Sequence, residues 1–255
     1  MVRSSIIFSL FSLCVACSSG VDQESVKSAE ERFIAAMVDA SRDLSESDIY
    51  DGLISLKYGA SSLPEWRIEG ADTLILVSSL QSLDWYYADV EVGESLTTSS
   101  SADYVMWVTI PAELNASLQL IEPIADSVSL NTRLTELLGL RPEDDNSVVN
   151  LMWVNKNSLL RPSYDSDPTT TCGAITYPEV VVTEWYAEWF DETVEYSYES
   201  PTDGLNYPFT RLGYTYDWGA DRPKYGLSEF IVVPSSEMIL ELQMGCWSYY
   251  NSLSD

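Results

Sequence analysis

The chain has 255 residues, 45% of them hydrophobic, so it can bury a core as one large domain or two small ones. Its 40 Asp and Glu residues outnumber 13 Lys and Arg residues, which gives a formal net charge of -27. This charge excludes binding to nucleic acid through a basic patch. The absence of histidine from the sequence excludes Ser-His-Asp and Cys-His catalysis and His-based zinc sites.

The N-terminus has the layout of a secretory signal peptide, with one positive charge followed by an apolar run over residues 6–16. This run is shorter than the roughly 20 apolar residues that cross a bilayer. Residues 13–17, LCVAC, resemble the lipobox of bacterial lipoproteins, although Cys14 stands where that motif usually has leucine. The resemblance implies cleavage after Ala16 and acylation of Cys17. An ordinary cleaved signal peptide with incidental cysteines is the alternative.

The lipobox resemblance also implies a cellular location and divides the chain into three segments. Ser18 follows the acylated position where inner-membrane lipoproteins carry aspartate, which implies export to the outer membrane, facing the periplasm or the cell surface. Residues 1–16 are then the signal peptide, residues 17–27 the lipidated N-terminus and tether, and residues 28–255 one globular domain. Two or three acyl chains hold a protein stably on a bilayer, so the expected partner is the membrane.

Cysteine usage fits an exported protein. If Cys14 leaves with the signal and Cys17 takes the lipid, Cys172 and Cys246 remain. An isolated cysteine pair in an oxidising compartment is expected to form a disulfide, which over this loop length contributes about 4.5 kcal/mol as an upper estimate. A redox pair or metal site is the weaker alternative because the chain has no CxxC spacing and no histidine.

Two helices are predicted from local signals. Ser28 and Glu31 form a capping box ahead of an amphipathic pattern over residues 29–43. Leucines at helical spacing over residues 130–138 end at Gly139, which can adopt the left-handed conformation that terminates a helix. A third helix after residue 182, over the aromatic segment 183–196, is favoured over continuation of a preceding strand.

Strand-like segments fill much of the remaining chain, so the expected fold is a single α+β domain with a mainly antiparallel sheet and a few helices. The strongest pattern alternates from Met238 to Cys246 and places Cys246 on the core side. Pro234-Ser235-Ser236 lies between this strand and the one before it, so a C-terminal β-hairpin over about residues 227–247 is predicted. The other strand candidates are 73–77, 104–110, 148–154 and 230–233.

Acid-base chemistry without histidine would use paired carboxylates, as in glycoside hydrolysis, with tryptophan and tyrosine stacking on sugar rings. The chain carries 16 Tyr and 8 Trp, but spacing along the sequence singles out no carboxylate pair. Asp217 and Glu229 are candidates because they lie in aromatic or apolar segments that can perturb a carboxyl pKa. A buried salt bridge to Arg211 explains these residues equally well, so they form only a speculative polar site.

Other chemistries have weaker signals. The acidic clusters at residues 143–145 and at Asp165 and Asp167 do not match an EF-hand, and solvated loops are the preferred interpretation over calcium binding. The sequence lacks GxGxxG, GxxxxGK[ST] and GxSxG motifs. We therefore expect no cofactor and no bound metal, and no catalytic residue can be assigned.

From about residue 133 onwards, the chain loosely resembles uncharacterised secreted bacterial proteins. The shared elements are Arg161, Pro162 and Asp165, then Cys172, then residues 210–218 and residues 226–230. This resemblance implies no activity. The favoured function is that of an acylated envelope lipoprotein acting as a non-enzymatic binding or structural component, with an envelope protein or a glycan as partner. The alternative is a histidine-free glycan hydrolase with paired carboxylates.

Overall fold

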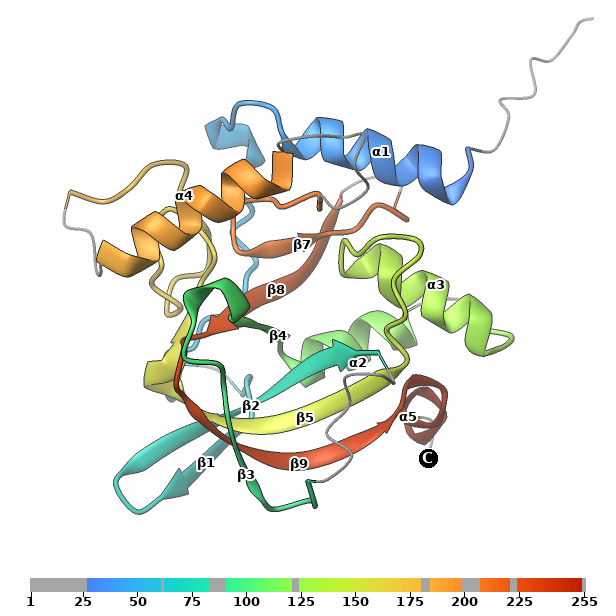
Figure 1. Cartoon of the computed structure of the whole chain (residues 1–255). Coiled ribbons are helices and arrows are strands. Elements are labelled where there is room, and N and C mark those ends of the chain that lie inside the picture. Colours follow the sequence, from blue (N-terminus) through green and yellow to red (C-terminus); the bar gives the residue numbers. More distant parts are fainter. Residues whose placement is uncertain are drawn as a thin grey trace, which may run out of the picture.

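The computed structural model describes residues 27–60, 62–82, 90–120, 124–179, 184–198, 207–220 and 224–253 (Figure 1). The helices are α1 Ala29–Ala40, α2 Pro111–Gln119, α3 Ser127–Leu137, α4 Glu184–Tyr198 and α5 Cys246–Ser252. The strands are β1 Trp66–Glu69, β2 Asp72–Gln81, β3 Ser95–Thr97, β4 Met106–Thr109, β5 Val148–Asn155, β6 Leu159–Leu160, β7 Tyr214–Tyr216, β8 Tyr225–Val232 and β9 Glu237–Gly245. These elements form one α+β domain with an antiparallel sheet, as the sequence predicts.

The strands described form one sheet in the order β3-β9-β5-β2-β4-β8-β6, with β1 added to β2 and β7 added to β8. The longest ladders join β2 to β5 and β5 to β9 along nearly their whole lengths. In contrast, β2 pairs with β4 only through Ser78 and Thr109. The two strands separate beyond this point, so the sheet opens between its β5 half and its β8 half.

The predicted C-terminal hairpin is wrong, although both of its strands exist. β8 pairs with β4, β6 and β7, whereas β9 pairs with β3 and β5. Between them, the chain passes Ser235, whose φ is 58°, and its amide donates to the Ser99 carbonyl. The turn is therefore held by the segment that follows β3, which brings β9 to the opposite part of the sheet (Figure 1).

The alternation expected along the last strand is also interrupted. The pairing of β9 with β5 shifts between Leu151 and Met152, which leaves Glu241 as an extra residue in β9. Because one inserted residue reverses the side-chain alternation, Leu240 and Leu242 belong to different core clusters. The Met238 to Cys246 series is therefore divided between the two faces of the sheet.

Helix boundaries follow the local signals closely. Both hydrogen bonds of the Ser28–Glu31 capping box are present, at 3.1 and 2.8 Å. Gly139 has a φ of 67° and ends the turn after α3, because a glycine adopts this conformation without steric cost. The predicted third helix is present as α4, which covers the aromatic segment from Glu184, with Tyr186 stacked on Phe190 at a centroid distance of 5.8 Å.

The core lies on both faces of the curved sheet. One face carries a cluster of β-strand residues including Ile75, Met152 and Phe230. The opposite face is covered by α2, α3 and α5 at one end and by α4 at the other. In Figure 1, α4 lies beside β7 and β8, while α3 and α5 lie near the far ends of β5 and β9. The helices on this face are therefore grouped on either side of the opening between β2 and β4.

The structure does not contain the predicted Cys172–Cys246 disulfide, because both cysteines are free. Cys246 is buried at the start of α5, where its thiol donates to the Asn146 carbonyl at 3.2 Å. Cys172 lies in the loop after β6, where its carbonyl accepts from Thr170. The two thiols thus belong to separately packed parts of the fold, a separation that cysteine count and compartment do not reveal.

Alkylation can test the free thiols. We expect Cys172 and Cys246 to be labelled to the same extent with and without prior reduction when the protein is unfolded. In the native protein, Cys246 should react more slowly, because burial raises the pKa of its thiol to about 12. Mass spectrometry of the tryptic peptides measures both extents. Labelling of the pair only after reduction would contradict this expectation.

The predicted signal peptide, the predicted tether through residue 26 and the predicted acylation site Cys17 lie outside the described residues. No helix within the described ranges is long and apolar enough to cross a membrane.

Candidate functional site

A cavity of about 900 Å³ opens where β2 and β4 separate. One wall comes from the end of β2 at residues 79–82 and another from residues 103–107 leading into β4. α4 and the segment before β7 supply the third wall, and the loop after α3 closes the remaining side. Its volume lies within the range typical of small-molecule sites. The cavity therefore lies where the pairing of two neighbouring strands is incomplete.

The cavity wall is rich in aromatic side chains. Trp107 lies 5.8 Å from Trp189 and 5.6 Å from Phe209, measured between ring centroids. The ring of Phe209 is nearly perpendicular to that of Trp107, with an interplanar angle of 83°. Tyr196 and Tyr207 add rings with hydroxyl groups to the same lining. These rings come from β4, α4 and the segment before β7, so only the folded chain brings them together.

Glu229 lies on β8 and contributes its carboxyl group to this cavity. Its backbone is fixed by pairing with Thr109 of β4 and by a hydrogen bond from its amide to the Gly213 carbonyl. The carboxyl group makes no hydrogen bond or ion pair with any described residue. Burial alone raises its pKa to about 8, so this side chain is largely protonated at neutral pH. The surface that it keeps accessible faces the cavity.

The cavity lining carries charges of one sign. Among the described residues, the acidic members are Glu229 and, closer to the exposed rim, Asp103, Glu143, Asp144 and Asp145. None of the described lining residues is Lys or Arg. Asp144 is held by Arg141 at 2.8 Å, while Glu143 and Asp145 are exposed. The entrance therefore has a negative potential, consistent with the acidic composition of the chain.

Asp217 does not share a site with Glu229 or Arg211. Its carboxylate accepts two hydrogen bonds from Arg133 of α3, at 2.8 and 2.5 Å, and also accepts the amide protons of Gly219 and Ala220. Asp217 is buried, and the pair attaches α3 to the turn after β7. This ion pair has a structural role in holding one wall of the cavity.

Asp217→Asn is expected to lower the free energy of unfolding by about 2 kcal/mol, because among the described carboxylates it leaves the Arg133 guanidinium with only its longer contact to Glu136 at 3.7 Å. Urea unfolding at pH 7 measures the change. The exposed Asp43→Asn removes the same charge from the surface and should change stability by less than about 0.5 kcal/mol. Equal effects of the two substitutions would show that the buried pair contributes nothing specific.

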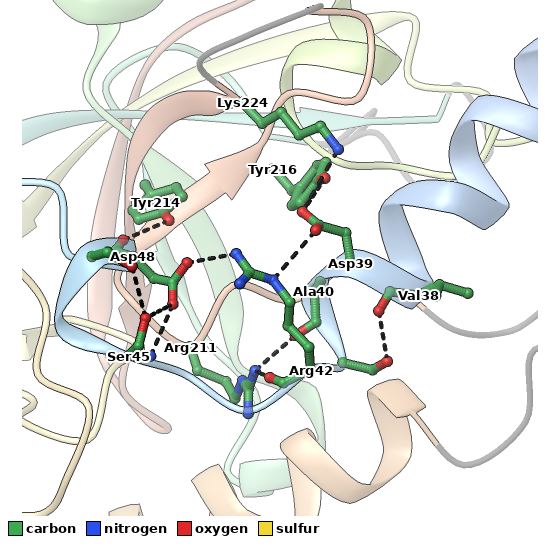
Figure 2. A network of polar contacts seen from close by, with 12 residues as sticks. Val38, Asp39, Ala40, Arg42, Ser45, Asp48, Arg211, Tyr214, Tyr216 and Lys224 are labelled. Carbon is green, nitrogen blue, oxygen red and sulfur yellow. Dashed lines mark hydrogen bonds and ion pairs between the residues drawn. The ribbon is translucent and has the colours of Figure 1, made fainter.

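Arg211 binds backbone carbonyls and has no carboxylate partner among the described residues. Its guanidinium donates to the carbonyls of Ala40 and Arg42, both at 2.7 Å, and lies over the ring of Tyr198. Figure 2 shows it beneath the segment that leaves α1. The predicted salt bridge of Arg211 to Asp217 and Glu229 is therefore wrong. Arg211 fixes the end of α1 to the strand region before β7.

The same region contains a surface ion-pair network (Figure 2). Asp39 contacts the phenol of Tyr216 at 2.7 Å and the ammonium of Lys224 at 3.6 Å, while Asp48 binds Arg42 at 2.5 Å. Burial opposes ionisation of Asp39, but these partners outweigh it and lower the pKa of that carboxyl. The network surrounds a smaller hollow of about 400 Å³, whose charged groups are already paired with one another. It therefore attaches α1 to β7 and leaves no unpaired anchor for a ligand.

Glu113 is a second buried carboxyl, one that sequence reasoning missed. It lies on α2, where its two oxygens accept from the amide and the hydroxyl of Ser228 at 2.7 and 3.0 Å. Burial outweighs these bonds and raises its pKa to about 7. Ser228 precedes Glu229 on β8, and successive residues point to opposite faces. The Ser228 hydroxyl that binds Glu113 therefore points away from the Glu229 side chain, and Glu113 does not line the cavity.

The two acidic clusters considered for calcium serve local structure. The Asp165 carboxylate accepts from the amide of Asp167, whose own carboxylate accepts from Thr169. Asp144 pairs with Arg141. Within the described ranges, no group of three Asp, Glu, Cys or His residues is arranged to hold a metal ion.

Comparison of the chain with known protein families, with curated proteins and with solved structures finds no match. The resemblances to lipoproteins and to secreted bacterial proteins therefore stay predictions. Of the three residues of the speculative polar site, the structure assigns only Glu229 to the cavity. The aromatic residues and the second strand that complete the cavity come from distant segments, and the sequence carries no local signal that these segments meet at one site.

Proposed function

We propose that this protein is a non-enzymatic binding protein of the bacterial cell envelope that holds a small organic molecule in the cavity between β2, β4 and α4. The observation that carries the proposal is a buried carboxyl group, Glu229, which has no partner among the described residues and faces a cavity of about 900 Å³. Buried polar groups are normally hydrogen-bonded, so a group left open to a cavity is available to a ligand.

The aromatic wall supports the same proposal. Trp107, Trp189 and Phe209 all line the cavity, and Trp107 packs against the other two rings at centroid distances of 5.8 and 5.6 Å. Such rings supply large apolar contact areas with little loss of conformational entropy on binding. Filling of the cavity by a ligand would remove this surface from water.

A pair of matched variants tests whether the cavity binds ligands. Thr193 lines the cavity on α4, and its hydroxyl donates to the carbonyl four residues before it. Thr132 makes the same type of bond on α3 but is exposed outside the cavity. We expect Thr193→Trp to abolish binding of hits from a calorimetric screen of amines, sugars and amino acids, and Thr132→Trp to retain it. Hits that bind both variants equally would overturn the cavity as the site.

The envelope location rests on the lipobox resemblance and is tested separately. Cys17→Ser should release the protein from the membrane fraction of expressing cells. The intact mass of the native protein should correspond to a chain that begins at Cys17 and carries acyl groups. Retention of the serine variant in the membrane fraction would overturn lipid anchoring while leaving the cavity proposal unaffected.

A glycan hydrolase is the second candidate, and one observation favours it. Glu229 is protonated at neutral pH in an aromatic cavity, which is the state required of a general acid. The reaction would also need a second carboxylate on the opposite side of the scissile bond, which the cavity lining can offer only near the rim. Turnover of aryl glycosides that is lost in Glu229→Gln would favour the hydrolase, and binding without turnover would favour the binding protein.

A further inference from the structure

The charged residues that line the cavity indicate which sign of charge a ligand can carry. The described lining has five acidic residues and no basic one, so it offers an anionic ligand no opposite charge. The guanidinium of Arg141 lies over the ring of Tyr207, a lining residue, but is already bound to Asp144. Its positive charge is therefore matched by a neighbouring carboxylate.

The aromatic wall favours a ligand with a positive charge. A cation placed within about 6 Å of an aromatic ring is attracted by the negative face of that ring, most strongly by tryptophan. Trp107 and Trp189 lie side by side in the wall at 5.8 Å, and Phe209 stands against Trp107 at 5.6 Å. The parts of these rings that line the cavity can contact an ammonium group and its apolar substituents.

Glu229 supplies the carboxyl group that can balance one positive charge. A neutral ligand such as a sugar needs donors and acceptors at several positions, and the lining hydroxyls of Thr193, Ser197, Thr210 and Thr215 already donate to backbone carbonyls. The carboxyl of Glu229, in contrast, has no partner among the described residues. A single carboxyl beside aromatic rings suits one positive charge. The acidic rim would attract a cation from solution and raise its association rate.

We propose that the cavity binds an organic cation, an amine or quaternary ammonium compound with an apolar or aromatic body, whose charge is balanced by Glu229 and whose body contacts Trp107, Trp189 and Phe209. This inference rests on the proposed binding function and specifies its ligand class.

Binding of a cation is expected to release the proton of the Glu229 carboxyl. The carboxyl of Glu229 is protonated below about pH 8 in the empty cavity, and a bound cation favours its ionised form. Binding at pH 7 therefore releases a proton, and affinity rises with pH until it levels off above pH 8. The other ionisable groups of the described lining are Asp103, Glu143, Asp144, Asp145 and the phenols of Tyr104, Tyr196, Tyr207, Tyr214 and Tyr216.

Two probes of matched shape test the inference. Tyramine carries an ammonium group, and tyrosol has a hydroxyl group at the same position on the same phenol and ethylene body. Isothermal titration calorimetry at pH 8.5 should show tyramine binding at least tenfold tighter than tyrosol. Glu229→Gln should weaken tyramine at least tenfold and change tyrosol by less than about threefold. The surface variant Glu195→Gln should leave both affinities unchanged.

The outcomes separate the inference from the proposed function. Equal affinities for the two probes, or tyramine binding that is unaffected by Glu229→Gln, would overturn the cation as the ligand class. If a sugar or another neutral compound then binds wild type and Thr132→Trp but not Thr193→Trp, the cavity remains a binding site for a different class. Absence of measurable binding by either probe at millimolar concentration would also overturn the inference.

Discussion

Replacement of Glu229 by glutamine is expected to stabilise the protein by about 4 kcal/mol at pH 8 and to have little effect at pH 5. The carboxyl has a pKa near 8 in the folded protein because burial disfavours its charged form, whereas its ordinary value is 4.5. Between these values the unfolded chain has released the proton and the folded chain retains it. The stability contributed by the neutral carboxyl is thus complete below pH 4.5 and is lost as pH rises to 8.

Glu113 adds to the same trend. Its folded pKa of about 7 lies above the ordinary value, so its contribution is lost between about pH 4.5 and 7. The large negative charge of the chain acts in the same direction, because protonation at low pH reduces self-repulsion. Wild type should therefore be more stable at pH 5 than at pH 8.

A comparison of variants isolates the Glu229 contribution. Urea unfolding at intervals from pH 5 to 9 should give a flatter stability profile for Glu229→Gln than for wild type. Glu195→Gln removes one exposed charge from α4 and controls for the change in net charge. Parallel profiles for wild type and Glu229→Gln would show that Glu229 ionises at its ordinary pKa and is not held in a dry environment.

Local structure could be predicted from the sequence because its causes are local. The capping box at Ser28 acts over three residues, and Gly139 ends a helix through its own backbone conformation. The partner of β8 depends on distant segments, so alternation alone suggested a hairpin with β9 that does not form. The inserted Glu241 likewise becomes visible only against the register of β5.

In the candidate site, too, the sequence revealed local features but not the contacts made with distant segments. A carboxyl in an apolar strand marked Glu229 as unusual, and the structure places it in a cavity. Asp217 and Arg211 have similar sequence surroundings, yet Asp217 pairs with Arg133 and Arg211 binds carbonyls after α1. Those partners lie far away in the chain, so composition and spacing could not distinguish a structural charge from an available one.

Arg161→Met is expected to lower the free energy of unfolding by about 4 kcal/mol. Arg161 is fully buried after β6, and its guanidinium lies 4.8 Å from the centroid of the Phe230 ring. Its two terminal nitrogens donate to carbonyls of three separate segments, namely those of Ile54, Gly213, Pro168 and Thr170, at 2.8 to 3.4 Å. Methionine fills similar space but removes all four of these hydrogen bonds, so among the described residues the Gly213 and Pro168 carbonyls keep only their bonds from the amides of Glu229 and Leu56.

The charge state of Arg161 supports a structural role. Burial lowers the pKa of this guanidinium to about 10, which still leaves it protonated at neutral pH. Gly213 must also remain without a side chain, because a Cβ atom there would lie 2.5 Å from the Arg161 Cγ atom. The Gly213 carbonyl that Arg161 holds also accepts the amide of Glu229, so the same arginine supports the strand that carries the cavity carboxyl.

Chemical unfolding of Arg161→Met, Arg161→Lys and Arg42→Met measures the effect. Lysine keeps the charge but has one nitrogen, whereas two nitrogens of Arg161 donate to the four carbonyls in the native protein. We therefore expect Arg161→Lys to recover less than half of the free energy of unfolding that Arg161→Met loses. Arg42 is 54% exposed and forms surface ion pairs, so its replacement should cost less than about 1 kcal/mol. If lysine restored full stability, the charge alone would account for the role of Arg161, and the geometry of its two donating nitrogens would be irrelevant.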